Sequence, residues 1–520
     1  MTARTETIPE AIQRHARERG DALAYWTPAR HWTFAELDET AGRIARGLAG
    51  LGIGARDRVA CLTKHTADCV ALVLGANRIG AVCMPVNWRL APAEIEYIVD
   101  NGEAKLMLVD RAFAEAWKQV KAPTVKPTVI TEEFAAWYSG KEPLKKESKI
   151  DPGETALQLY SSGTTGLPKG VELTHANLAA AMMDAVPEAI GYRGIGNVML
   201  NALPTYHIAG VGVALLTAAR GGPSVLYPDF DPAKILLGIP EHRVTHAFLV
   251  PAMIQFLLQV PGVEQGDYST LQGISYGASP ISEKVLTGAL RTFKCNFMQV
   301  YGLTETTGAV TCLPPEDHDP EGPKQGLLRS AGKAIAGVEL RAVDPVTGRD
   351  CPEGGVGEIW IRTAQNMRGY WGNARATADA FVDRGADGMG WFRSGDAGFL
   401  KDGYLFLHDR IKDMIVSGGE NIYPAEVENV LMQHPAVADG AVIGVPDEQW
   451  GESVKACVVL KKESAASEKD VIDFMRARIA HYKCPKSVDF VDAIPRNPTG
   501  KILKRVLREP YWKGKQRRVN

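Results

Sequence analysis

Residues 160–170 form a loop rich in glycine and hydroxyl side chains, and this loop places the tightest limit on the fold. It reads Tyr-Ser-Ser-Gly-Thr-Thr-Gly-Leu-Pro-Lys-Gly, with strand-like runs before it at 155–160 and after it at 171–174. Glycines permit the positive φ angles of an anion-binding turn, and free backbone N–H groups can then face phosphate. The pattern predicts a phosphate-binding loop between two strands.

The loop differs from the two common nucleotide-binding motifs. A Walker A loop ends in Gly-Lys-Ser/Thr, whereas Pro168-Lys169-Gly170 leads here into a strand pattern. The stretch 194–199 lacks the third glycine of the dinucleotide fingerprint. The sequence therefore indicates neither a P-loop NTPase nor a Rossmann dehydrogenase.

The first 110 residues alternate between helical and strand patterns. Thr33-Phe-Ala-Glu36 is a capping box, and apolar residues follow at helical spacing up to Leu48. Residues 59–62 read as a short buried strand and residues 67–76 as the next helix. This alternation predicts an α/β layered architecture.

The last 110 residues have a different character. Pro424 starts a helical pattern, Val454 to Leu460 read as a strand, and Ser467 to Asp470 cap a helix expected to extend to Ile479. A small α+β domain is predicted. We place its boundary in the charged stretch 409–413, which gives domains of residues 1–411 and 412–520.

Composition excludes several classes of protein. The 520 residues are 45% hydrophobic and 23% charged with a net charge of −2, which is typical of a globular chain and gives no support for nucleic-acid binding. The longest apolar stretch, 208–219, is too short to span a bilayer, and no secretory signal is visible. The eight scattered cysteines form no CxxC pair, so we expect buried, reduced thiols and a cytoplasmic location.

Eight motifs together resemble the adenylate-forming enzymes, which include acyl-CoA synthetases, adenylation domains of peptide synthetases and luciferases. The resemblance covers essentially the whole chain and is greatest to bacterial fatty-acyl-CoA ligases. Besides the 160–170 loop, the motifs are Pro204-Thr-Tyr-His207, Tyr276-Gly-Ala-Ser-Pro280, Tyr301-Gly-Leu-Thr-Glu305, Gly357-Glu-Ile-Trp-Ile-Arg362, Trp391-Phe-Arg-Ser-Gly-Asp396, Asp409-Arg-Ile-Lys-Asp413 with Ser417-Gly-Gly-Glu-Asn421, and Pro495-Arg-Asn-Pro-Thr-Gly-Lys501.

The resemblance implies a fold and an activity. The fold is α/β, with a large N-terminal domain of layered mixed sheets and helices and a small mobile C-terminal α+β domain. The activity joins a small-molecule carboxylic acid to ATP with Mg²⁺, giving an acyl-adenylate and pyrophosphate. A thiol, expected to be that of CoA, then takes the acyl group and releases AMP.

The resemblance also implies roles for individual residues in adenylation. Thr304 and Glu305 would lie at the α-phosphate, and Lys501 would bridge the substrate carboxylate and that phosphate. Glu305 and Thr165 would bind the metal ion. Asp396 and Arg410 would hold the ribose. The phosphate loop would contribute Ser161, Ser162, Gly163, Thr164, Thr165, Gly166 and Lys169, and the adenine site Gly277, Ala278, Ser279, Tyr301 and Gly302.

Roles in the thioester-forming step follow in the same way. His207 matches an aromatic gate beside the acyl site, although a satisfied core histidine is the competing interpretation. Lys412 matches the hinge about which the small domain turns, a position where many relatives have aspartate. Contacts with CoA would come from Gly418, Gly419, Arg89, Trp450, Tyr482 and Lys486.

The segments that would bound the acyl site are apolar and small. Residues 207–216, 246–256, 275–280 and 301–310 contain no lysine or arginine for a second carboxylate, and residues 208–212 contain no aspartate for an ammonium group. Gly277 suits an elongated chain. We expect a medium- to long-chain monocarboxylic fatty acid.

Alternatives remain open at this point. An aryl or cyclic acid fits the same apolar site. An acyl-AMP ligase that loads a carrier-protein thiol also fits the motifs. Enzymes of that kind tend to carry an insertion ahead of the hinge, whereas the 396–410 connection here is short. The last twenty residues carry eight Lys or Arg and one Glu, which allows peripheral membrane contact. Both a monomer and a homodimer are compatible with the sequence.

Overall fold

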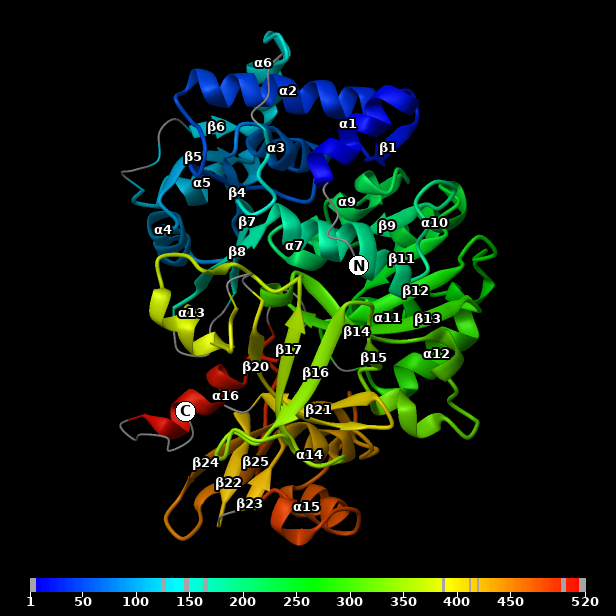
Figure 1. Ribbon diagram of the computed structural model, residues 1–520. Coiled ribbons are helices and arrows are strands. Elements are labelled where there is room, and N and C mark those ends of the chain that lie inside the picture. Colours follow the sequence, from blue (N-terminus) through cyan, green and yellow to red (C-terminus); the bar gives the residue numbers. More distant parts are fainter. Residues whose placement is uncertain are drawn as a thin grey trace. The chain divides into compact units, whose positions relative to one another are not determined.

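The computed structural model describes residues 6–122, 125, 128–144, 149–161, 167–279, 281–385, 389–410, 413–418, 420–496 and 502–513. The chain divides into two compact units (Figure 1). The first unit comprises residues 1–277, 283–339 and 361–392, and the second comprises residues 278–282, 340–360 and 393–520.

One sheet of the first unit has the strand order β15-β14-β13-β12-β11-β9-β10-β1-β2. Its central strands β9 to β13 run parallel, and β14 pairs antiparallel with β13. The strands are β1 (Leu23–Trp26), β2 (His31–Thr33), β9 (Met199–Asn201), β10 (Ser224–Leu226), β11 (His246–Leu249), β12 (Gly273–Gly277), β13 (Asn296–Leu303), β14 (Gly308–Leu313) and β15 (Lys333–Ala334).

The other sheet of the first unit has the order β18-β8-β7-β4-β3-β5-β6. Strands β3 to β6 are parallel, whereas β7 and β8 form an antiparallel pair with the predicted phosphate loop between them. The strands are β3 (Arg58–Leu62), β4 (Val82–Pro85), β5 (Ala104–Val109), β6 (Thr128–Ile130), β7 (Thr155–Ser161), β8 (Lys169–Thr174) and β18 (Gly369–Tyr370).

Two buried helices separate these sheets. Helix α3 contacts β4 and β7 of one sheet, α9 contacts β9, β10 and β14 of the other, and the two helices contact each other. Both are buried along almost their whole length, as expected of helices that are apolar on every side. The apolar stretch 208–219 noted in the sequence is therefore a core helix of this layered arrangement.

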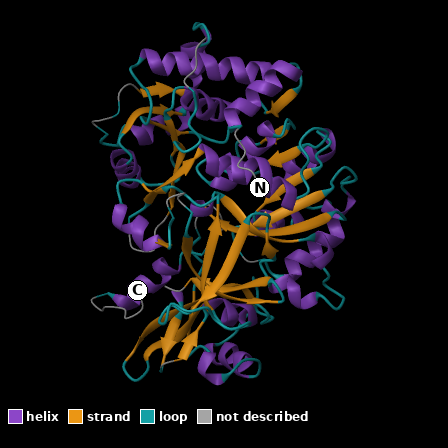
Figure 2. Ribbon diagram, viewed as in Figure 1, coloured by secondary structure: helices purple, strands orange, loops and turns teal. Residues whose placement is uncertain are grey.

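Helices also cover the outer faces, as Figure 2 shows. The helices of the first unit are α1 (Ile8–Arg19), α2 (Phe34–Gly50), α3 (Ala67–Arg78), α4 (Pro92–Asn101), α5 (Ala114–Trp117), α6 (Thr131–Ser139), α7 (His175–Ala179), α8 (Val186–Ala189), α9 (Ile208–Ala219), α10 (Pro232–Glu241), α11 (Pro251–Leu258), α12 (Glu283–Phe293) and α13 (Ala374–Ala380). A π-helical segment, η2 (Ala180–Ala185), joins α7 to α8. Strand β19 (Phe381–Val382) pairs with the start of β20 (Trp391–Lys401).

The second unit contains the ribbon β16-β17-β20-β21 and a separate sheet of β22 to β26. Helices α14 and α15 cover an apolar core on that sheet. The elements not yet given are β16 (Val338–Val343), β17 (Gly357–Thr363), β21 (Tyr404–Arg410), β22 (Ile415–Ser417), β23 (Glu420–Ile422), β24 (Val437–Asp447), β25 (Gly451–Leu460), β26 (Ser487–Phe490), α14 (Pro424–Leu431), α15 (Glu468–Arg476) and α16 (Lys504–Trp512).

Most local predictions agree with these elements. The Thr33–Glu36 and Ser467–Asp470 capping boxes start α2 and α15, and Pro424 starts α14. One helix end is corrected: α15 ends at Arg476, so Ile479 lies beyond it and packs against the apolar core from the following turn. The periodic apolar pattern did not distinguish that turn from helix. All eight cysteines are free thiols and most are buried, as predicted.

Candidate active site

The Glu305 carboxylate is the centre of a hydrogen-bonded group in the first unit. Glu305 lies in a short 3₁₀ turn, η4 (Thr304–Thr306), directly after β13, and is only 9% exposed. The hydroxyls of Ser161 and Tyr370 both donate to its Oε1 atom, at 2.9 and 3.2 Å. One carboxylate oxygen is thus fixed by two donors, which orients the whole group.

Three chain segments meet at this carboxylate. Ser161 ends β7, and Tyr370 belongs to β18, which pairs with β8. The Met367 N–H donates to the Glu305 carbonyl at 2.8 Å, and the Trp371 N–H donates to the Gly170 carbonyl at 2.7 Å. These backbone bonds hold the Tyr370 segment against the Glu305 turn and against β8, one of the two strands that flank the phosphate loop.

Tyr370 was not identified from the sequence. It follows the Gly357–Arg362 motif by eight residues and belongs to no motif that was recognised. Its signal is weak because a single tyrosine beside a tryptophan is more often part of the core. Only the folded structure brings Tyr370 to the proposed site. There the Lys169 ammonium also lies 4.8 Å from the centre of the Tyr370 ring.

A buried ion pair braces the strands around the phosphate loop. Arg58 of β3 forms a 3.0 Å bond with Glu172 of β8 and a 3.2 Å bond with the Gln158 side chain of β7. The indole of Trp371 stacks on the Arg58 guanidinium at 3.3 Å from the ring centre. These contacts join β3, β7, β8 and the Tyr370 segment. Within the loop, Ser162, Gly163, Thr164, Thr165 and Gly166 lie outside the described residues.

The strand ends expected to hold adenine approach each other closely. A side chain at Gly277 would collide with the Val300 carbonyl of the neighbouring parallel strand, and one at Gly302 would collide with the Gly308 carbonyl. Tyr301 lies between these close contacts on β13. Ala278 and Ser279 follow β12 at the start of a segment in the second unit, and Ala278 adopts a left-handed φ of 68°. Glycine is required here for backbone proximity.

His207 precedes the first turn of α9, in the N-cap position. Its ring lies 4.7 Å from that of Tyr206, which in turn meets Trp88 edge-on. Its buried Nε2 has no hydrogen-bond partner in the part of the chain that is described. Desolvation, with a smaller contribution from the Arg89 charge, lowers the pKa of His207 to about 4. The imidazole is therefore neutral near pH 7.

Asp396 lies in the second unit and is 8% exposed. It pairs across the antiparallel β20–β21 ladder with Arg410, and its backbone N–H donates to the Ser394 hydroxyl at 3.1 Å. The strand register therefore puts the backbones of Asp396 and Arg410 opposite each other. The Arg410 side chain, Lys412, Gly419 and Lys501 lie outside the part that the structure describes.

Three residues predicted to contact CoA come together in the second unit. Gly418 has a φ of 61°, and a side chain there would lie 2.6 Å from the indole of Trp450. The Lys486 ammonium lies 5.1 Å from the Trp450 ring centre. The Trp450 indole is 44% exposed and Tyr482 is 51% exposed. Arg89, in the first unit, is exposed beside Trp88.

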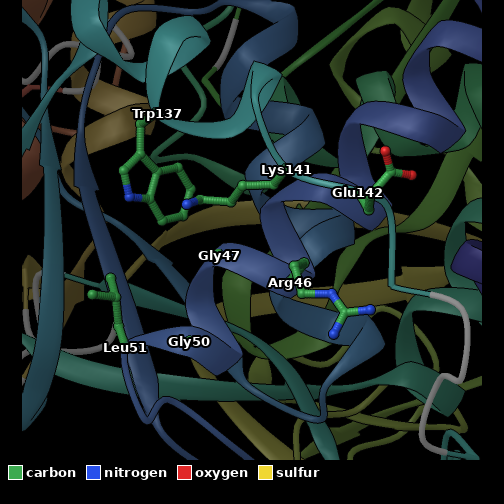
Figure 3. Close-up of a pocket in the computed structure, with 7 residues that line it drawn as sticks. All are labelled: Arg46, Gly47, Gly50, Leu51, Trp137, Lys141 and Glu142. Atoms are coloured by element: carbon green, nitrogen blue, oxygen red, sulfur yellow. The ribbon is translucent and has the colours of Figure 1, made fainter.

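A surface hollow of about 380 Å³ lies elsewhere on the first unit, between α2 and α6 (Figure 3). The backbone of Gly47 packs so closely on Trp137 that a side chain at this position would collide with the indole. The Lys141 side chain extends along the same ring. Arg46 and Glu142 complete its polar rim. None of the predicted site residues lines this hollow.

Sequence profiles place the chain in a family. The profile described as AMP-binding enzyme matches residues 12–371, and that described as AMP-binding enzyme C-terminal domain matches residues 426–501. The chain belongs to this family of adenylate-forming enzymes and is an AMP-forming acid–thiol ligase.

The similar proteins are named for different acids and for different acyl acceptors. The chain is 38% identical to the fatty acid–[acyl-carrier-protein] ligase ScoC of Streptomyces coeruleorubidus, over 99% of this chain and 98% of that protein. It is 37% identical to the long-chain-fatty-acid–CoA ligase FadD13 of Mycobacterium tuberculosis, over 92% and 93%. It is 36% identical to a feruloyl-CoA synthase from an Amycolatopsis species, over 96% and 98%.

A solved structure matches the chain over nearly its full length. ATP-bound MatB from Rhodopseudomonas palustris has a TM-score of 0.88 at 30% identity, over 98% of this chain and 100% of that one. The predicted fold class, a large N-terminal sheet domain with a small C-terminal domain, is thereby confirmed. No described helix is both long and apolar enough to cross a bilayer.

Proposed function

We propose that this ligase activates a medium- to long-chain monocarboxylic fatty acid with ATP and transfers the acyl group to CoA. The observation that carries the proposal is the apolar character of the chain around the start of α9. The atoms nearest to the Cβ positions of Gly212 and Gly308 there all belong to the apolar side chains of Met182 and Ile208. A fatty chain can be buried against such residues, whereas a second carboxylate would lose its hydration without a cationic partner.

In the first step, an oxygen of the substrate carboxylate attacks the α-phosphorus of ATP. The bond to the bridging oxygen breaks, and pyrophosphate leaves with the electron pair. Two anions must approach each other, so charge neutralisation and alignment are the main requirements. Lys169 on the hairpin, the donors of the 161–166 loop and Lys501 would provide this charge, with Thr304 at the α-phosphate.

Glu305 fits the proposed role of magnesium ligand. Its two described hydroxyl donors both bind Oε1, and no described residue donates to Oε2. The described residues contain no cluster of three or more metal-ligating side chains. Magnesium is usually held by one or two carboxylates together with substrate phosphates, which fits this arrangement. The ion, when bound by Glu305 and Thr165, would supply positive charge to the phosphate oxygens.

Residues for nucleotide orientation are proposed in each unit separately. The Asp396 carboxylate would accept hydrogen bonds from the ribose hydroxyls with help from Arg410, and Tyr301 would stack on adenine beside Gly277, Ala278, Ser279 and Gly302. The support is that Asp396 is buried opposite Arg410 and that the strand ends at Gly277 and Gly302 leave no room for side chains.

In the second step, the CoA thiolate attacks the acyl carbonyl and AMP leaves. The exposed Trp450 indole lies beside the Lys486 cation and packs closely on Gly418. An aromatic ring next to a cation suits a ligand with an aromatic base and phosphates. Tyr482, Gly419 and Arg89 belong to the same proposal. The division into domains 1–411 and 412–520, with a hinge at Lys412, would let one small domain serve both steps.

A panel of acids tests the proposal directly. The enzyme is incubated with ATP, Mg²⁺ and CoA, and with acetate, fatty acids of six, ten and sixteen carbons, benzoate, phenylacetate or malonate. AMP and thioester are quantified, with Lys501→Ala as the inactive control. We expect the highest kcat/KM among the fatty acids. A maximum for benzoate or phenylacetate would support the aryl alternative and overturn the proposed acid.

The same assay distinguishes the two acceptors. A phosphopantetheine-bearing carrier protein replaces CoA in parallel reactions. Rapid thioester formation with CoA supports the proposal. Acyl-AMP that accumulates with CoA but disappears when carrier protein is added would support the carrier-protein alternative.

A further inference from the structure

Two glycines on different elements face the same methionine in the first unit. Gly212 belongs to α9, and Gly308, with a φ of 112°, begins β14. The Met182 Cε atom lies 2.8 Å from where a Cβ on Gly212 would stand and 3.3 Å from where one on Gly308 would stand. The end of the Met182 side chain therefore fills space that two absent side chains leave.

Met182 occupies this position because its helix is locally widened. It lies in the π-helical segment η2, which ends at Ala185, and Pro187 follows in α8. Proline has no N–H to donate to the Met183 carbonyl, four residues earlier, and the Arg220 side chain donates to that carbonyl instead, at 3.2 Å. π-helical turns of this kind are often found at functional sites.

The third neighbour is Ile208, the first residue of α9 after His207. Its Cδ1 atom lies 3.4 Å from the Cβ position of Gly212, and its Cγ1 atom lies 4.0 Å from that of Gly308. Met182 thus closes the space between the two glycines directly beside the residue predicted to gate the acyl site. Met182 is 4% exposed, so its thioether is buried among apolar groups.

We propose that Met182 is a movable stop that sets the chain length of the acyl substrate. This inference rests on the proposed function. An unbranched thioether has three side-chain torsions and changes shape at low cost, and the glycines present no side chain that would oppose its movement. The acyl chain would extend past Ile208 into the space that Met182 now fills, and the position of the thioether would decide how many carbons fit.

The adjacent Met183 provides a matched control. It has the same side chain, lies in the same π-helical segment and is 1% exposed. The atoms nearest to the Cβ positions of Gly212 and Gly308 belong to Met182 and not to Met183. A general loss of packing should therefore affect both alanine variants, whereas a stop should depend on Met182 alone.

The experiment compares wild type, Met182→Ala and Met183→Ala on saturated fatty acids of six to sixteen carbons. Pyrophosphate release gives kcat/KM, and thermal unfolding reports the fold. For Met182→Ala we expect the optimum to move to longer chains. We compare kcat/KM for an acid two methylenes longer than the wild-type optimum with kcat/KM at that optimum. This ratio should rise on the order of tenfold, which corresponds to the free energy of burying two methylenes. Met183→Ala should keep the wild-type profile.

A second pair of variants tests the direction. Gly212→Ala would crowd the Met182 thioether and should shift the optimum to shorter acids, and adding Met182→Ala should reverse that shift. If Met182→Ala unfolds, Met182→Leu keeps the volume but branches at Cγ, and it should lower kcat/KM for the longest acid accepted.

Each result bears on a different claim. Equal profiles for the two alanine variants would overturn the inference while leaving the proposed function standing. A wild-type enzyme that activates no fatty acid would overturn the proposed function. The same comparison would then use arylalkanoic acids of increasing length, and an unchanged length profile in Met182→Ala would overturn the inference there as well.

Discussion

Tyr370 donates its hydroxyl hydrogen to the Oε1 atom of Glu305 at 3.2 Å, across 65 residues of sequence. Ser161 donates to the same oxygen, so the carboxylate is held from two sides. The Oε2 oxygen, to which no described residue donates, is then oriented by contacts that the sequence motifs do not reveal. This makes Tyr370 a positioning residue for the group proposed to bind magnesium.

Replacing Tyr370 by phenylalanine should lower the adenylation rate about tenfold, because a hydrogen bond to a charged group is worth roughly 1.5–3 kcal/mol and only part of it supports catalysis. The Mg²⁺ concentration for half-maximal pyrophosphate release should rise. Binding of Mn²⁺ in the presence of a non-hydrolysable ATP analogue, followed by electron paramagnetic resonance, should weaken in parallel.

Tyr138→Phe is the control for Tyr370→Phe. The Tyr138 hydroxyl of α6 also donates to a carboxylate oxygen, that of Asp68 in α3, at 3.2 Å, and neither residue belongs to the proposed site. This variant should change thermal stability without changing the Mg²⁺ requirement. Equal Mg²⁺ requirements in Tyr370→Phe and wild type would show that Tyr370 does not position the carboxylate.

Removing the positive charge of Arg58 should destabilise the first unit strongly. The Arg58 and Glu172 side chains are 6% and 14% exposed, so Arg58→Met leaves a buried carboxylate without its partner. Such losses cost about 3–5 kcal/mol in the free energy of unfolding. Chemical denaturation measures the loss, and Arg58→Met with Glu172→Met should recover much of it. A double variant that is no more stable than the single one would contradict this explanation.

His207 should act through its shape near neutral pH and not as a base. Burial lowers the pKa of His207 to about 4, so the ring does not titrate between pH 6 and 8. His207→Phe should keep kcat/KM within about threefold, since a ring of similar size remains, whereas His207→Ala should lose about tenfold or more. The pH profiles of both variants should match wild type from pH 6 to 8. A profile in which His207→Phe loses an acidic limb would indicate general-base catalysis instead.

His65 should make the protein sensitive to acid. It is 2% exposed, and its two ring nitrogens have no hydrogen-bond partner within the described residues. Desolvation lowers the pKa of His65 to about 3 in the folded protein, from 6.5 in the unfolded chain. The unfolded chain therefore takes up a proton first as the pH falls, and stability decreases from pH 6.5 towards pH 3.

A substitution isolates the contribution of His65. Between pH 7 and pH 5 the wild type should lose about 2 kcal/mol through this residue, and His65→Leu should remove that part of the loss. Urea unfolding at the two pH values measures the difference, with His31→Gln as an exposed control. If His65→Leu and wild type lose equal stability, His65 is accessible to protons in the folded state.

The sequence by itself determined the local elements and the family. The capping boxes at Thr33 and Ser467, the strands around the phosphate loop and the proline start of α14 were all predicted, because neighbouring backbone and side-chain atoms fix such features. The end of α15 was missed since an apolar periodicity continues through a turn that packs against the same core.

Only the tertiary structure decided which distant side chains meet. Ser161 and Glu305 are 144 residues apart and share a hydrogen bond, and Tyr370 joins them through the pairing of β18 with β8. Met182 meets Gly212 and Gly308 because α9 packs against both the π-helical turn and β14. Contacts of this kind depend on how layers pack, which no local rule of propensity or spacing encodes.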